Sequence, residues 1–125
     1  MPSCSKTERV LHVVDRMDCG GVETLVMRVY RQLDRSGLQF DFAVAQRGCD
    51  YDAEILAGGG RLHELPRPTL GNLVNYSVAL TTILRRHGPF AAVHSHVHHC
   101  SGAVLLAARA AGVHVRIAHS HTTND

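Results

Sequence analysis

Short apolar runs alternate along the chain with longer segments in which apolar residues recur every three or four positions. Residues 10–14 are apolar at nearly every position, which is typical of a strand buried on both faces of a sheet. From Val22 to Leu33 the apolar residues follow helical spacing, with polar residues between them. The same change from one pattern to the other is repeated to the end of the chain. The sequence therefore predicts alternating strands and helices.

Glycine and proline residues separate these predicted elements, most clearly at Gly37, Gly88-Pro89 and Gly112. The predicted strands are residues 10–14, 39–45, 61–65, 91–94 and 115–118. The predicted helices are residues 22–33, 51–57, 73–84 and 101–111. Regular strand–helix alternation predicts an α/β fold, with an open, mainly parallel sheet and helices on both faces.

Three polar features lie at or just after the ends of predicted strands. Gly20 and Gly21 follow the first strand, the His94–His96 pair ends the fourth, and the His119–His121 pair follows the fifth. The carboxyl ends of parallel strands meet at one edge of a sheet, where ligands bind in folds of this class. We therefore expect the three features to face one crevice.

The glycine turn is a candidate anion site, because a strand, a glycine turn and a helix together present backbone N–H groups to a ligand. Two glycines let a phosphate approach closely. The third glycine of the dinucleotide-binding fingerprint is missing, which disfavours a nicotinamide site. Glu23 suits the start of a helix but would repel a phosphate, so a phosphate is expected on the Gly20–Gly21 side. A tight turn without a ligand is the alternative.

The histidines allow three interpretations. Residues two apart on a strand face the same way, so each H-x-H pair could converge on a metal ion, although no clear carboxylate completes such a site. Neutral histidines could instead donate hydrogen bonds to a hydroxyl-rich ligand. They could also be satisfied within the sheet. Elsewhere, histidines 12, 63, 87 and 114 are predicted to be structural or exposed.

Composition narrows the class of protein without deciding its function. A chain of 125 residues, 45% of them hydrophobic, suffices for one domain. The net charge of +2, without a Lys/Arg cluster, gives no sign of nucleic-acid binding. Four irregularly spaced cysteines predict reduced thiols, and residues 1–9 lack the apolar core of a secretory signal. We therefore expect a cytoplasmic protein.

Several motifs in order carry a family resemblance. Residues 9–14 with Gly20-Gly21-Val22-Glu23-Thr24, then residues 39–44, 59–62, 92–96 and 115–122, resemble glycosyltransferase family 4 over residues 9–123. The resemblance implies a Rossmann-like domain, the N-terminal, acceptor-side half of a GT-B fold. It implies retaining transfer from a nucleotide-sugar to a glycan or lipid-linked acceptor, generally without a metal or other cofactor. Surface polysaccharide synthesis at the inner face of the membrane is the implied setting.

The resemblance also assigns roles to individual residues. Gly20 and Gly21 match the loop that approaches the donor diphosphate, and His96 matches a histidine that contacts the transferred sugar or the acceptor. His98, His121 and Thr122 match residues of the acceptor and sugar cleft.

The resemblance further predicts an incomplete domain at residues 9–125 after a disordered segment 1–8. The donor domain and its glutamate motif lie beyond Asp125, so this chain alone is expected to be inactive. The alternatives are a metal-dependent hydrolase that uses both H-x-H pairs and a non-catalytic ligand-binding domain.

Overall fold

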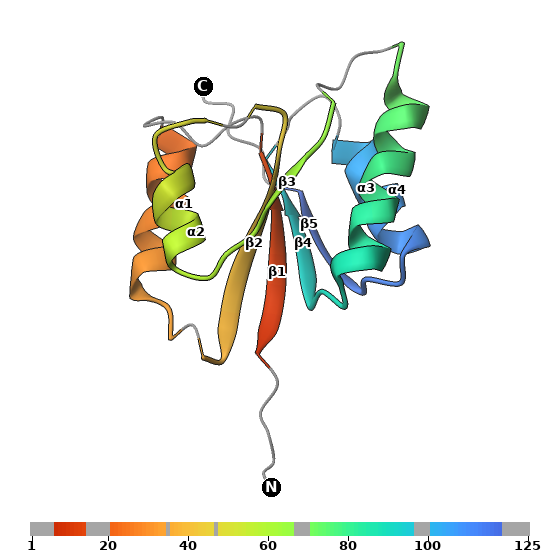
Figure 1. Cartoon of the computed structure of the whole chain (residues 1–125). Coiled ribbons are helices and arrows are strands. Elements are labelled where there is room, and N and C mark those ends of the chain that lie inside the picture. Colours follow the sequence, from red (N-terminus) through yellow and green to blue (C-terminus); the bar gives the residue numbers. More distant parts are fainter. Residues whose placement is uncertain are drawn as a thin grey trace, which may run out of the picture.

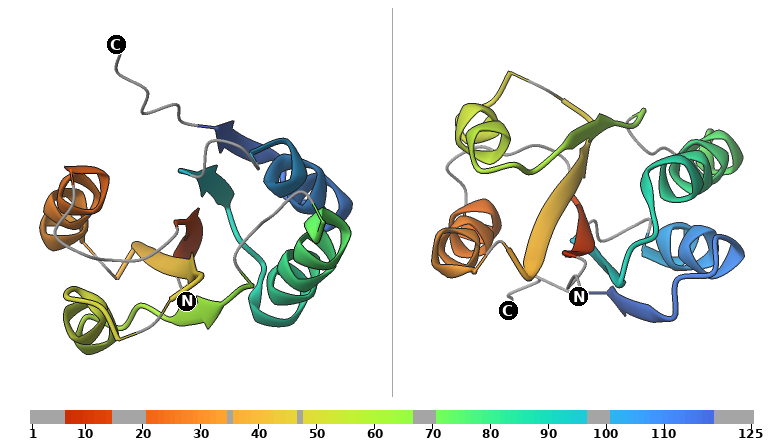
Figure 2. Two further views of the ribbon diagram at one scale, coloured as in Figure 1. Left: turned by 90° about the horizontal axis from the view of Figure 1, so that it is seen from above. Right: turned by 60° about the horizontal axis from the view of Figure 1, so that its bottom comes forward.

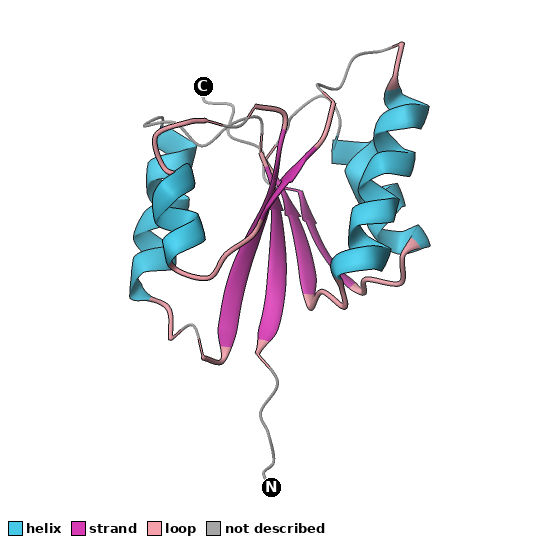
Figure 3. Ribbon diagram, in the orientation of Figure 1, coloured by secondary structure: helices cyan, strands magenta, loops and turns pink. Residues whose placement is uncertain are grey.

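The computed structural model describes residues 7–14, 21–34, 36–46, 48–66, 71–96 and 101–118. In these segments, strands and helices alternate in sequence order (Figures 1 and 3). The strands are Glu8–Val13 (β1), Leu38–Val44 (β2), Leu62–Glu64 (β3), Ala92–Ser95 (β4) and Val115–Ala118 (β5). The helices are Gly21–Gln32 (α1), Asp52–Ala57 (α2), Leu73–His87 (α3) and Ser101–Ala110 (α4).

All of these strands are parallel and form one sheet in the order β3-β2-β1-β4-β5. β2 and then β3 are added on one side of β1. The chain then crosses back, and β4 and β5 are added on the other side of β1. Helices α1 and α2 cover one face, and α3 and α4 cover the other (Figures 1 and 2). The predicted α/β fold with an open parallel sheet is confirmed.

The predicted elements are all present, with bounds that differ by three residues at most. The largest difference is at α3, which continues to His87 instead of ending at residue 84. Its last turn carries Arg85, Arg86 and His87, and cationic side chains stabilise the carboxyl end of a helix. The spacing of apolar residues does not reveal this last turn, because its side chains are polar or charged and bury no apolar face.

The sheet separates two hydrophobic cores. Leu11 and Val13 of β1 face α3 and α4, where they pack with Leu80, Val93 and Val104. The intervening positions of β1 face α1 and α2, where the core contains Val14, Met27, Tyr30, Phe40, Phe42 and Ile55. Alternating side chains of one buried strand thus supply both cores, which explains why residues 10–14 are almost wholly apolar.

A groove with an apolar lining runs along the outer surface between α3 and α4. Val74, Val78 and Leu106 line it and are more than half exposed, and Arg85 lies at one end of it. None of the described helices has both the length and the apolar content needed to cross a membrane. The groove is a surface feature of the face opposite α1 and α2.

Asp41 is a fully buried carboxylate in the middle of β2. It accepts hydrogen bonds from the Arg9 side chain, from the Arg61 backbone N–H at 3.1 Å and from Arg61 Nε at 2.9 Å. Burial alone would raise the pKa of this carboxyl, but the neighbouring His63, Arg61 and Arg9 outweigh it and lower the pKa below its ordinary value. The ionised carboxylate therefore joins β1, β2 and the start of β3.

Gly60 is packed closely between α1, α2 and the backbone of β2. Tyr30 of α1 donates a hydrogen bond from its hydroxyl to the Ile55 carbonyl and accepts one from the Gly60 N–H. A Cβ atom at residue 60 would lie 2.7 Å from the Phe40 carbonyl oxygen and 2.8 Å from Ile55 Cγ2. Only glycine fits there without displacing the backbone of β2.

We expect Asp41→Asn to lower the free energy of unfolding by about 3 kcal/mol at pH 7, because two guanidinium groups lose their buried counter-charge. The folded-state pKa of Asp41 is lowered, so its contribution is complete above the unfolded pKa and disappears as the pH falls through the folded value. The difference in urea unfolding between the two proteins should thus begin to shrink near pH 4 and should vanish only at a pH below the lowered folded pKa. Exposed Asp50→Asn is the control, and an equal loss there would contradict the prediction.

We expect Gly60→Ala to destabilise the domain by about 1–3 kcal/mol, because its Cβ meets backbone and a core methyl group. Gly102→Ala is the matched control. Gly102 lies in α4 with nothing within 4 Å of its added Cβ, so alanine there should stabilise by about 0.5–1 kcal/mol through helix propensity. Chemical denaturation of the two variants should give shifts of opposite sign.

Candidate functional site

The order of the strands reverses between β1 and β4, and in open α/β sheets ligands bind outside the carboxyl ends of the strands at such a point. The backbone N–H of His96, directly after β4, donates a 2.9 Å hydrogen bond to the Val13 carbonyl at the end of β1. Gly21 begins α1, the helix that follows β1. The end of β4 is thus hydrogen-bonded to β1, the strand that precedes the glycine turn in the sequence.

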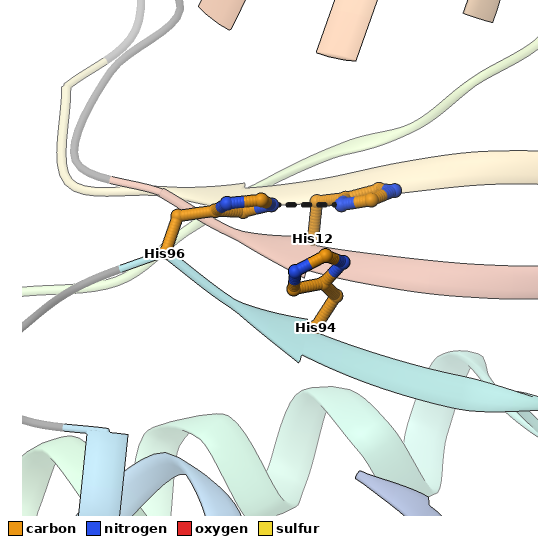
Figure 4. A group of neighbouring side chains, drawn as sticks. All are labelled: His12, His94 and His96. Atoms are coloured by element: carbon orange, nitrogen blue, oxygen red, sulfur yellow. Dashed lines mark hydrogen bonds between the residues drawn. The ribbon is translucent and has the colours of Figure 1, made fainter. Parts of the chain in front are cut away.

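Three histidines meet at this reversal point on the α1 side of the sheet. His12 of β1 is paired in register with His94 of β4, and His96 lies two residues further on the same face. His12 Nδ1 and His96 Nε2 are 3.1 Å apart in a hydrogen bond, and the His94 ring lies to one side of the line between them (Figure 4). One ring nitrogen from each lies within 4.8 Å of the other two. We call these residues the histidine cluster.

The rings of the cluster are packed against one another and against aromatic residues. The His94 and His96 ring centroids are 4.1 Å apart with nearly parallel planes, and the centroid of His12 lies 5.3 Å from each. On its other side, His12 meets Phe40 edge to face at 4.2 Å. The cluster is therefore a continuation of the core beneath α1 and α2, half-buried at His94 and His96.

His12 is held in its neutral form. Its side chain is 5% exposed, and burial lowers its pKa well below the ordinary value, with the charges that His96 and His94 could carry acting in the same direction. A neutral imidazole has one N–H and one bare nitrogen, so it can donate and accept at once. Within the described residues, His12 Nε2 has no hydrogen-bond partner. Near neutral pH the cluster thus contains a buried imidazole that is both a donor and an acceptor.

Two of the predicted site residues fall within the described structure. His96 lies at the expected edge of the sheet, and Gly21 opens α1. The predicted convergence of the 94/96 pair on one face is confirmed by the stacking of its rings. Gly20, His98, His121 and Thr122, together with His119, lie outside the described residues, and their assigned places remain predictions.

His12 is the member of the cluster that the sequence pattern did not single out. It is buried, as a structural assignment requires, but it also contacts His96 across 84 positions of sequence. The missing information is the pairing of β1 with β4, which is not local. His63 and His87 stack on each other at 4.4 Å near Asp41, and His114 is exposed, so their structural or surface assignment agrees with the structure.

The chemistry available here is that of three neighbouring imidazoles, one of them buried and two half-buried. Among the described residues, no carboxylate or thiolate joins the cluster. His96, whose ring is oriented by its contact with His12, is a side chain of the type that hydrogen-bonds polar ligands. The arrangement favours orienting a polar ligand over forming a covalent intermediate.

Similar proteins support a particular interpretation of this site. The chain is 45% identical over 121 residues to the Bacillus subtilis (strain 168) protein named "Putative glycosyltransferase EpsF". The match covers 96% of this chain and 32% of the relative, so the chain spans about a third of the length of that protein.

Two solved structures share the fold. MurG of Acinetobacter baumannii superposes with a TM-score of 0.62 at 16% identity, over 88% of this chain and 34% of that one. The C-terminal domain of a hydrogenase from Pyrococcus furiosus gives 0.59 at 15% identity, over 95% and 96%. Proteins with such different names share this Rossmann-like fold, so the fold by itself does not decide the function.

The family assignment comes instead from the sequence match to a family model. The model for Glycosyltransferase Family 4 matches residues 19–125, which include the glycine turn, His94 and His96. The ordered motifs that suggested this resemblance lie mostly in the same stretch. This chain belongs to glycosyltransferase family 4.

Proposed function

We propose that this domain is the acceptor-side half of a retaining glycosyltransferase with a GT-B fold. It would act with a second domain to transfer a sugar from a nucleotide-sugar to a glycan or a lipid-linked acceptor, in the synthesis of a surface polysaccharide. Support comes from membership of glycosyltransferase family 4 and from the similarity to the B. subtilis protein named "Putative glycosyltransferase EpsF".

The position of His96 is the observation that carries the proposal. Its ring stands at the carboxyl ends of β1 and β4, where the strand order reverses and ligands bind in open α/β sheets. His12 Nδ1 lies 3.1 Å from Nε2 of this ring and helps to fix its orientation. A ring fixed in this way can orient a sugar hydroxyl without first losing rotational freedom.

The turn before α1 would stabilise the leaving diphosphate. Backbone N–H groups at the start of a helix are unpaired within the helix and lie at its positive end. In the proposed mechanism, Gly20 and Gly21 present these groups to the charge that develops when the glycosidic bond to the donor breaks. Glu23, in the first turn of α1, would keep the phosphate toward the glycine side.

The rest of the transfer machinery is proposed to lie in a donor domain outside these 125 residues. That domain would bind the nucleotide, so the chain alone should not catalyse transfer. We place the enzyme in the cytoplasm, at the inner face of the membrane, and propose that transfer needs no metal cofactor. The apolar groove between α3 and α4, with Arg85 at one end, offers a surface for peripheral membrane contact.

We expect His96→Ala to lower the rate of sugar transfer at least about 100-fold in the complete protein that carries this domain, because a positioned hydrogen bond in the transition state is lost. Transfer of radiolabelled sugar to acceptor measures the effect, and circular dichroism of the variant checks the fold. His114→Ala, which removes an exposed imidazole, should keep the full rate. Unchanged transfer in the His96 variant would remove this residue from the site.

For the 125-residue chain alone, we expect weak binding of acceptor without transfer or donor hydrolysis. Titration of acceptor followed by NMR, with product analysis by mass spectrometry, separates these outcomes. Measurable turnover by the isolated chain would contradict the proposed division of the site between two domains.

A further inference from the structure

We propose that His12, His94 and His96 form a site for one divalent transition-metal ion, of the kind represented by Zn²⁺, Co²⁺ and Ni²⁺, with a coordination position left open. This inference does not depend on the proposed transfer reaction, because it needs neither donor nor acceptor.

The spacing of the three rings suits such an ion. Two nitrogens bound to a tetrahedral zinc ion at about 2.0–2.1 Å lie about 3.3 Å apart. His12 Nδ1 and His96 Nε2 are already 3.1 Å apart, and a nitrogen of His94 lies within 4.8 Å of both. His94 is on one side of the line that joins the other two rings (Figure 4). An ion placed on that side requires only rotation of the rings about their soft terminal torsions.

The strands hold two of the three ligands close together before any ion binds. His12 and His94 are register partners on adjacent strands, and the His96 N–H is bonded to the Val13 carbonyl at the end of β1. Phe40 packs edge to face against the His12 ring and keeps this ring beside the other two. A preformed set of ligands loses less conformational freedom on binding than ligands from mobile loops would.

The hydrogen bond within the cluster determines how the ligands meet an ion. Imidazole binds metal through a bare nitrogen. In the hydrogen bond between His12 and His96, one nitrogen carries the proton and the other is bare. Metal binding to both requires that proton to move to the second nitrogen of the same ring, so a tautomer changes and no proton is released.

The donor set indicates which ions fit. Three imidazoles without a carboxylate from the described residues suit zinc, cobalt, nickel and copper, whereas magnesium and calcium prefer oxygen ligands. Three protein ligands leave a fourth position for water or a ligand oxygen. The bound ion would take one ring nitrogen of His96, the side chain proposed to contact substrate. The ion would be a separate ligand of this domain and not a cofactor of transfer.

The test uses the untagged 125-residue chain, freed of metal with a chelator. Calorimetry with Zn²⁺ and visible absorption with Co²⁺ should each show saturable binding of one ion per chain. His94→Ala and His96→Ala should each weaken binding at least about tenfold, since losing a ligand costs more than losing an outer-shell partner. His114→Ala is the matched control and should bind as the parent does. Mg²⁺ should not bind measurably.

A second measurement guards against variants that fail to fold. Zn²⁺ should raise the thermal unfolding midpoint of the parent chain and of His114→Ala, and should leave that of His96→Ala unchanged. Absence of saturable zinc binding to the parent would overturn the proposal. Binding retained by both His94→Ala and His96→Ala would also overturn it, because the ion would then be held by other residues. Neither result would bear on the proposed glycosyl transfer.

Discussion

Everything at the candidate site depends on the pairing of β1 with strands on both of its sides. β1 is hydrogen-bonded to β2 on one side and to β4 on the other, and the strand order reverses between β1 and β4. This central position buries Leu11 and Val13 on one face and His12 on the other. The same pairing brings His94 and His96 beside β1, although they are more than eighty residues away in sequence. If β1 were displaced, both hydrophobic cores and the histidine cluster would lose contacts at the same time.

The cluster is an unusual use of core space. Burying an imidazole removes water from its polar nitrogens, which is unfavourable unless other groups take their place. Here Nδ1 of His12 is compensated by Nε2 of His96, at a position where Phe40 and Phe42 would otherwise favour a purely apolar neighbour. The buried His12 imidazole thus lowers the hydrophobic stabilisation from this face of the sheet. It places hydrogen-bonding nitrogens near the carboxyl ends of the strands instead. Such an exchange is typical of functional positions, where local stability and function compete.

The sequence predicts the fold well because each element has a local signal. The apolar run of β1, the helical spacing in α1 and the glycines at the ends of helices need no knowledge of distant residues. His94 and His96 could be placed on one face for the same reason, since two positions on a strand determine a common direction. The partnership of His12 with His96, and the burial of Asp41 between Arg9 and Arg61, could not be predicted. They depend on which strands are neighbours and in what register, and no short segment encodes that.

The two hydrophobic cores are in contact only through the sheet, and this separation makes the domain thermodynamically modular. Substitutions beneath α3 and α4 share no packing partner with those beneath α1 and α2, so their effects on stability should add. The outer helices α3 and α4 can therefore diverge in evolution, or be redesigned for a different surface, with little effect on the histidines of the opposite face. Changes of surface on the α3 and α4 side can thus be made largely independently of the chemistry on the α1 side.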